Sequence, residues 1–233
     1  MVSVTSATGE VFESDLFVIN ADAAWFRGKF LQRKQYSEAK LDKMEWTLAP
    51  FTIYLGVKGT IPGIHHHNYF LGDNFRAYAD TIFRSTVAPE KPYYYVNVAS
   101  KSNPDCVPEG CENLFILCPV PDLRVKADWG DADQLVNEII EDLGKRVNFD
   151  IKNNILTQVV YTPNEWQKMF NLYKGSGLGL AHGLNQIGAL RPANKDEKLN
   201  NVYYVGASTH PGTGLPIVVI GSRLVTERIE NEH

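Results

Sequence analysis

Residues 205–216 read VGASTHPGTGLP, and this stretch decides how the C-terminal part of the chain folds. A strand is expected over residues 201–205, where β-branched and aromatic residues run up to the first glycine. Gly212 and Gly214 permit positive φ angles and a close approach of the backbone to a ligand. Pro216 suits the first turn of a helix, and an apolar run follows it. The stretch therefore predicts a strand, a glycine-rich turn and a helix.

The predicted helix would direct its N-terminus at whatever the turn holds. Free N–H groups and the helix dipole favour negative charge there. A phosphate fits this requirement, and so does the electron-rich pyrimidine edge of a reduced flavin. The alternative is a glycine-rich turn that only packs the helix on the strand.

Several further blocks, together with this stretch, resemble the phytoene-type carotenoid desaturases, in the order of that family. They are VINAD at 18–22, HHHNYFLG at 65–72, CPVP at 118–121, KGSGLGLAH at 174–182 and LNQIGALRP at 184–192. The resemblance implies an FAD-dependent flavoprotein. It also implies an α/β plus α+β fold, the C-terminal part of an FAD-binding Rossmann-like protein with an inserted mixed-sheet substrate domain.

The resemblance divides the chain into three segments. Residues 1–25 would be a strand segment of the FAD domain, ending in a buried strand. Residues 26–198 would form the substrate-binding domain, and residues 199–233 would return to the FAD domain as strand, glycine turn and helix.

The family's opening GxGxxG turn, which binds the ADP half of FAD, has no counterpart here. Gly175, Gly177 and Gly179 have GxGxG spacing, with no strand before them and no acidic residue about twenty positions later. The N-terminal residues instead indicate a hairpin and a strand. We therefore expect the C-terminal half of a larger enzyme, inactive by itself, whose partner is the missing N-terminal half.

Periodicity predicts the other elements. Alternating patterns predict strands at 49–59, 65–71, 93–99, 113–119 and 155–161. Helices are expected at 75–85, behind Asp131 with an apolar stripe from Leu135 to Val147, and at 163–172 behind Thr162 with Glu165 completing a capping box.

Composition excludes some classes of function. A net charge of −4 and the lack of a basic stripe argue against nucleic-acid binding. No apolar run approaches the roughly 18 residues that span a bilayer.

The three cysteines form no CxxC pair and indicate reduced thiols. We expect a cytoplasmic protein, and the resemblance implies peripheral contact with a membrane that supplies the substrate.

The triple histidine at 65–67 is a candidate metal site. In a strand only His65 and His67 share a face, and no nearby acidic or cysteine residue completes a ligand set. We therefore predict no metal, and we place His67 in or near the substrate cavity.

The cofactor contacts are expected through backbone more than side chain. The predicted residues are Gly206, Ala207, Ser208, Gly214, Leu215 and Pro216. Gln186, Arg191 and His210 are further candidates for positions near the flavin or the substrate. Each has a structural alternative: Arg191 as an ordinary ion-pair residue, and His210 as a residue that only caps the turn. No acid–base pair can be assigned from spacing.

Aromatic residues on consecutive predicted strands supply large apolar surfaces, of which about half should be core. The rest would line a tunnel for a polyene. The resemblance thus implies a carotenoid desaturase that transfers hydride from a polyene to flavin. The alternatives are a related flavoprotein (a carotenoid isomerase, retinol saturase or amine oxidase-like enzyme) and a non-catalytic fragment that binds a hydrophobic ligand.

Overall fold

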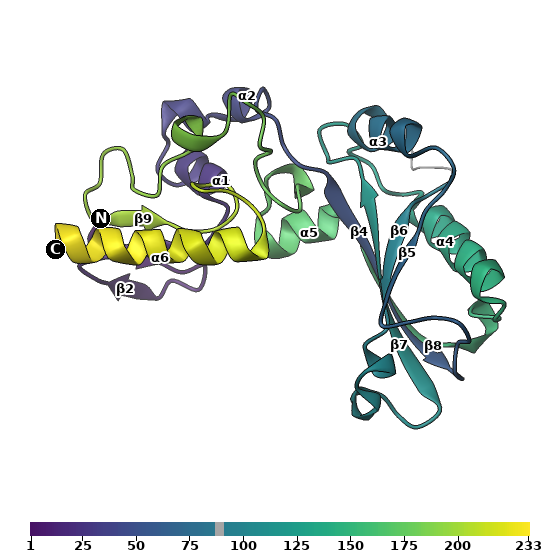
Figure 1. Ribbon diagram of the computed structural model, residues 1–233. Coiled ribbons are helices and arrows are strands. Elements are labelled where there is room, and N and C mark those ends of the chain that lie inside the picture. Colours follow the sequence, from purple (N-terminus) through teal and green to yellow (C-terminus); the bar gives the residue numbers. More distant parts are fainter. Residues whose placement is uncertain (87–90) are drawn as a thin grey trace. The chain divides into compact units, whose positions relative to one another are not determined.

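The computed structural model describes residues 1–86 and 91–233 (Figure 1). The chain folds into two compact units. The terminal unit comprises residues 1–47, 170–173 and 178–233, and the sheet unit comprises residues 48–169 and 174–177. The predicted boundaries at 25/26 and 198/199 do not coincide with these units, because residues 26–47 and 178–198 pack with the chain termini.

The sheet unit is built on a five-stranded sheet of order β5-β6-β7-β4-β8. Its strands are β4 (Ala49–Lys58), β5 (His67–Phe70), β6 (Tyr94–Asn97), β7 (Cys111–Val120) and β8 (Ile155–Tyr161). All its pairings are antiparallel, so the parallel pairing of this chain lies in the other unit. The five predicted strands are confirmed, with ends shifted by up to a few residues.

One face of this sheet carries the main core. Helix α4 (Ala132–Val147) buries its predicted stripe, including Leu135, Ile139 and Leu143, against inward-facing residues of β4 and β7. Asn148 ends the helix in the left-handed conformation, with φ 49°. The apolar stripe therefore predicts correctly which face of this helix packs on the sheet.

Two other helices of this unit also match the sequence. Helix α3 (Phe75–Arg84) starts at Asn74, whose side chain accepts from the Ala77 N–H. Helix α5 (Pro163–Phe170) ends earlier than predicted, and its capping box is confirmed: the Glu165 carboxylate accepts from the Thr162 N–H at 2.9 Å.

The opposite face of the sheet is lined by aromatic and apolar side chains, which we call the aromatic face. Two cross-strand rows define it. They are His67, Asn97, Phe115, Tyr54 and Val159, and Tyr69, Tyr95, Leu117, Thr52 and Tyr161. The expected alternation is confirmed, because Phe51 and Tyr94 are buried while Tyr69 is 74% exposed.

The terminal unit holds a parallel pair, β3 (Phe17–Ile19) with β9 (Val202–Tyr204). Its other elements are the hairpin β1 (Ser3–Thr5) and β2 (Val11–Glu13), the helices α1 (Ala23–Lys29), α2 (Glu38–Leu41) and α6 (Leu215–Glu232), and short 3₁₀ turns. The prediction of a buried strand near residue 19 is only half right, since Phe17 is buried but Val18 is 52% exposed. Within the described residues β3 pairs with β9 alone, so its other edge has no strand partner.

The fold class is confirmed: the chain has an α/β unit with a parallel pair and an α+β unit with an antiparallel sheet. No helix within residues 1–86 and 91–233 is both long and apolar enough to cross a bilayer. The cysteines Cys106, Cys111 and Cys118 are free thiols.

Candidate functional site

The carboxyl ends of β3 and β9 meet at one edge of the terminal unit. Val205, directly after β9, donates its N–H to the Ile19 carbonyl at 3.1 Å. Gly206 then turns with φ 108°, and a Cβ there would lie 3.5 Å from Asn20 Oδ1. In open α/β sheets, ligands bind beyond the carboxyl ends of the strands. This edge is therefore the candidate site.

The glycine-rich turn takes the conformation that its sequence predicts. Gly212 has φ 142° and Gly214 has φ 113°, values that L-residues with side chains rarely adopt. The peptide bond between His210 and Pro211 is cis. A Cβ on Gly212 would overlap Nε2 of His182, so glycine is required there for the packing as well.

Helix α6 begins at the end of this turn without a side-chain cap. Gly214 is the N-cap residue, and its carbonyl accepts from the Val218 N–H at 2.9 Å. Gly214, Leu215 and Pro216 are exposed, Leu215 to 85%. An uncapped, accessible helix N-terminus has the donors and the dipole to accept an electron-rich group. Contact of Gly214, Leu215 and Pro216 with a flavin stays a prediction.

Ser208 lies at the centre of the turn, where its side chain is used internally. Its hydroxyl is 3.5 Å from Asp22 Oδ2 and accepts from the Leu180 N–H at 3.4 Å. A Cβ on Gly179 would overlap this hydroxyl oxygen. Gly179, from the GxGxG cluster, therefore packs under the turn, and only the backbone around Ser208 remains for a ligand.

Asp22 is the acidic group of this edge. Its carboxylate caps α1 by accepting from the Trp25 N–H at 2.9 Å. Burial raises the pKa of Asp22, while the backbone N–H groups of Trp25, Tyr173 and Ala24 oppose that rise. The carboxyl group is thus held by the fold and positioned beside the turn.

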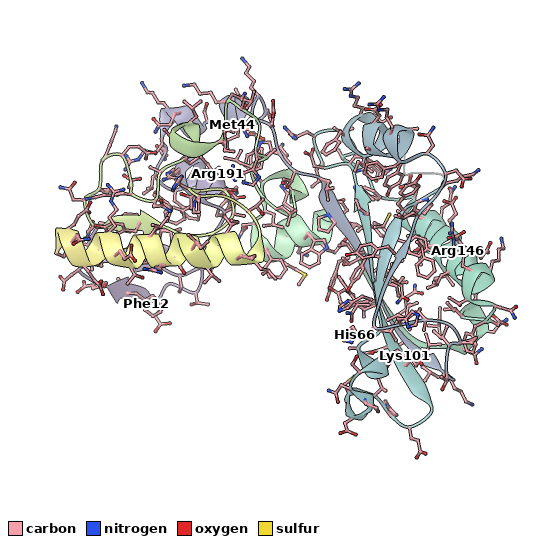
Figure 2. The ribbon with its side chains drawn as sticks, in the orientation of Figure 1. Phe12, Met44, His66, Lys101, Arg146 and Arg191 are labelled. Atoms are coloured by element: carbon pink, nitrogen blue, oxygen red, sulfur yellow. The ribbon has the colours of Figure 1, made fainter. Side chains whose placement is uncertain are left out.

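Gln186 and Arg191 hold loops in place. The Gln186 side-chain oxygen accepts from the Glu45 N–H at 2.8 Å, and its nitrogen donates to the Glu45 carbonyl at 2.8 Å. Arg191, labelled in Figure 2, is 3% exposed and donates to backbone carbonyls of Thr209 in the turn and of Ala181 in the preceding loop. His210 takes part through its backbone, whose N–H donates to the Pro192 carbonyl at 2.9 Å. Their placement near a flavin stays a prediction.

The histidine block belongs to the sheet unit and differs from the expected alternation. β5 starts only at His67, so His66 is not in the strand, and the rings of His66 and His67 lie 4.3 Å apart. His66 Nδ1 is 2.7 Å from Ser102 Oγ, and His67 Nδ1 is 2.6 Å from Tyr95 Oη (Figure 2 labels His66). Among the described residues no group of His, Cys, Asp or Glu is arranged to hold a metal ion.

Sequence reasoning missed the part played by His182. Its Nε2 accepts from the Thr213 N–H at 3.3 Å, which requires a neutral ring with the hydrogen on Nδ1. Burial and then the positive charge of Arg191 lower the pKa of His182. The local sequence gives no signal for this contact, because Thr213 lies 31 positions further along the chain.

The fold has counterparts among solved structures. A solved oxidoreductase from Methanosarcina mazei matches with a TM-score of 0.58 at 15% identity, over 97% of this chain and 48% of that chain. At this identity the match concerns the fold alone.

Curated relatives identify the resemblance more narrowly. A zeta-carotene-forming phytoene desaturase from Myxococcus xanthus is 37% identical over 223 residues, which is 95% of this chain and 43% of the relative. A phytoene desaturase from Fusarium fujikuroi is 31% identical over 98% of this chain and 45% of the relative. A carotenoid 3,4-desaturase from Haloarcula japonica is 29% identical over 97% of this chain and 46% of the relative.

These relatives confirm the resemblance to the phytoene-type carotenoid desaturases that the motifs indicate. The chain spans less than half the length of each of them. No family model matches the chain.

Proposed function

We propose that this chain carries part of the flavin site and the hydrocarbon-binding face of an FAD-dependent carotenoid desaturase. The observation that carries the proposal is the glycine-rich turn, which joins β9 to the uncapped α6 at the carboxyl edge of a parallel pair. The names of the curated relatives supply the reaction class. The ADP-binding turn would come from a separate N-terminal half.

The cofactor would be held mainly by backbone groups. Residues 206–208 lie at the strand edge and residues 214–216 at the start of α6, and all of them except Pro216 have a backbone N–H. When bound, FAD supplies a hydride acceptor for oxidation of the substrate. The chain's own contribution is to hold the reacting carbon in place and to stabilise negative charge through the N-terminus of α6.

The aromatic face is our candidate for polyene binding. Its rings contact one another across strands, with centroids 5.2 Å apart for Tyr54 and Phe115 and 5.1 Å apart for Tyr69 and Tyr95. The rows cross five strands, a width of about 19 Å at the usual strand spacing. Each Å² of apolar surface buried there by a hydrocarbon contributes about 25 cal/mol.

Reconstitution tests the proposal. The purified chain would be mixed with FAD and phytoene-loaded liposomes, with and without the N-terminal half of a phytoene desaturase. We expect retained flavin and new polyene absorbance from the pair, and neither from the chain alone. If the pair retains no flavin and forms no polyene, the desaturase assignment fails, and a hydrophobic-ligand-binding fragment becomes the better description.

Matched variants test the flavin contacts and the aromatic face separately. Gly206→Val should abolish flavin retention, whereas Gly9→Val, at another glycine of positive φ in the β1–β2 turn, should not. Phe115→Asp on the aromatic face should abolish polyene formation but spare flavin retention. Phe12→Asp is the control, because Phe12 is 53% exposed on the β1–β2 hairpin.

The product distinguishes a desaturase from related flavoproteins. A desaturase lengthens the conjugated chain and shifts the absorbance to longer wavelengths. Isomerisation with no added double bond would favour a carotenoid isomerase instead.

A further inference from the structure

Arg191 has an unusual set of partners inside the terminal unit. Its side chain is almost fully buried, and Figure 2 marks it among the loops of this unit. Backbone carbonyls accept from all five N–H donors of the Arg191 guanidinium. The acceptors are Thr209 at 3.0 Å from Nε, Ala181 at 3.0 Å and Gln186 at 3.1 Å from Nη1, and Leu180 at 2.8 Å and Ala207 at 2.6 Å from Nη2.

These acceptors come from two segments far apart in sequence. Leu180, Ala181 and Gln186 belong to the loop that follows the GxGxG cluster, and Ala207 and Thr209 belong to the glycine-rich turn. One rigid planar group thus ties the loop to the turn. Lysine has a single flexible ammonium and cannot reproduce this fork.

The surroundings of the Arg191 charge differ from those of Arg27, which is also buried, and of the partly buried Arg124. Arg27 pairs with Glu197 at 3.5 Å, and Arg124 pairs with Asp122 at 2.5 Å. None of the acceptors that the structure shows for Arg191 is a carboxylate. Burial lowers the pKa of this guanidinium, but its ordinary value is so high that it stays protonated at neutral pH.

We propose that Arg191 is the positioning residue of the glycine-rich turn and that its charge, unneutralised by a carboxylate, favours the negatively charged, reduced state of a flavin held there. The effect on the flavin rests on the proposed function. The positioning of the turn concerns this chain alone.

The pKa of His182 reports this charge. His182 directly follows Ala181, whose carbonyl accepts from Arg191, and its Nε2 accepts from the Thr213 N–H. Its imidazole would be titrated by NMR in the wild-type chain, in Arg191→Lys and in Arg191→Gln. Arg33→Gln serves as the control, because Arg33 pairs with Asp196 in the same unit.

We expect the His182 pKa to lie below the ordinary 6.5 in the wild type, in Arg33→Gln and in Arg191→Lys, and to rise in Arg191→Gln. Amide exchange at Thr213 should become about tenfold faster in both Arg191 variants, because both lose charge-assisted bonds to the turn. A merely structural arginine would alter exchange but would leave the His182 pKa equal in the lysine and glutamine variants.

Any of three results would overturn the inference. One is a wild-type His182 pKa at or above 6.5, a measurement that needs no variant to fold. The others are an unchanged His182 pKa in Arg191→Gln and unchanged amide exchange at Thr213.

The flavin half is tested on the reconstituted pair. The ratio of Kd values for oxidised and reduced FAD should fall about tenfold in Arg191→Gln and change less than about threefold in Arg191→Lys. An equal ratio in all variants refutes the role of the charge toward flavin. If even the wild type holds no FAD, the proposed function fails, and the His182 titration still decides the role of Arg191 in the turn.

Discussion

The two long helices of this chain contrast sharply. Helix α4 of the sheet unit buries five apolar side chains, whereas helix α6 of the terminal unit buries only Gly221 and Val225. α6 nevertheless carries more apolar residues, and several stay exposed, among them Val219 at 67% and Ile220 at 48%. Amphipathic patterning therefore accounts for α4, while α6 has apolar residues on more than the one face that packs in this structure.

The two sheets show the same contrast. The antiparallel sheet supports a core of its own under α4. The parallel pair has a half-exposed residue, Val18, in the middle of β3. Parallel strands are normally covered on both faces, so the terminal unit presents a partly uncovered layer. We expect substitutions in the core of the sheet unit to lower its stability, and substitutions of exposed apolar residues on α6 to change stability little.

The largest effect should come from the core under α4. Ile139→Ala removes methyl groups from a fully buried position and should lower the free energy of unfolding of the sheet unit by about 2–5 kcal/mol. Ile220→Ala on α6 should change the free energy of unfolding of the terminal unit by about 0.5 kcal/mol. Urea denaturation measures both, and similar losses at the two sites would remove the contrast.

The next largest loss of stability should come from a glycine in the candidate turn. Gly212→Ala should cost about 1–3 kcal/mol, because the new Cβ overlaps His182 and φ is 142°. Gly63→Ala is the milder control, because its φ of 66° lies in the left-handed region that other residues occasionally adopt and nothing lies within 4 Å of its Cβ position. Thermal unfolding compares the two variants, and equal losses would contradict the prediction.

The capping box of α5 should contribute less. Thr162→Ala removes the hydroxyl that accepts from the Asn164 N–H at 3.2 Å, at a cost of about 1 kcal/mol. Thr226→Ala on α6 is the control, because its hydroxyl only donates back to the Ser222 carbonyl within the helix. Chemical denaturation should rank the two variants in this order, and the reverse order would contradict the prediction.

The smallest effect depends on pH and concerns the end of α6. Bonds from Lys195, Tyr203 and Arg228 lower the pKa of Glu232 to about 2. Because the folded pKa lies below the unfolded value, the stabilisation is present above about pH 4.5 and is lost as the pH falls toward about 2.

Glu232→Gln should therefore flatten this part of the acid dependence of urea midpoints for the terminal unit. The pair Arg223–Glu227 on the same helix is more exposed, so Glu227→Gln should leave the profile nearly unchanged. Identical profiles for both variants would show that Glu232 does not anchor the helix.

Much of the fold could be predicted from local patterns. Period-two runs placed the strands of the antiparallel sheet, and the capping box at Thr162 placed the start of α5. The strand–turn–helix at residues 201–232 was also predictable, because glycine and proline there impose local backbone conformations. The histidine block was not, since its alternation depends on where β5 starts, which pairing with β6 decides.

The candidate site divides in the same way. By itself, the sequence determined the glycine-rich turn, the start of α6 and the family resemblance, because these depend on residues close together in the chain. Only the tertiary structure decided that Arg191 would donate to five carbonyls and that His182 would pack on Gly212. Such contacts join segments far apart in sequence, and their energies depend on burial and orientation, which no local pattern encodes.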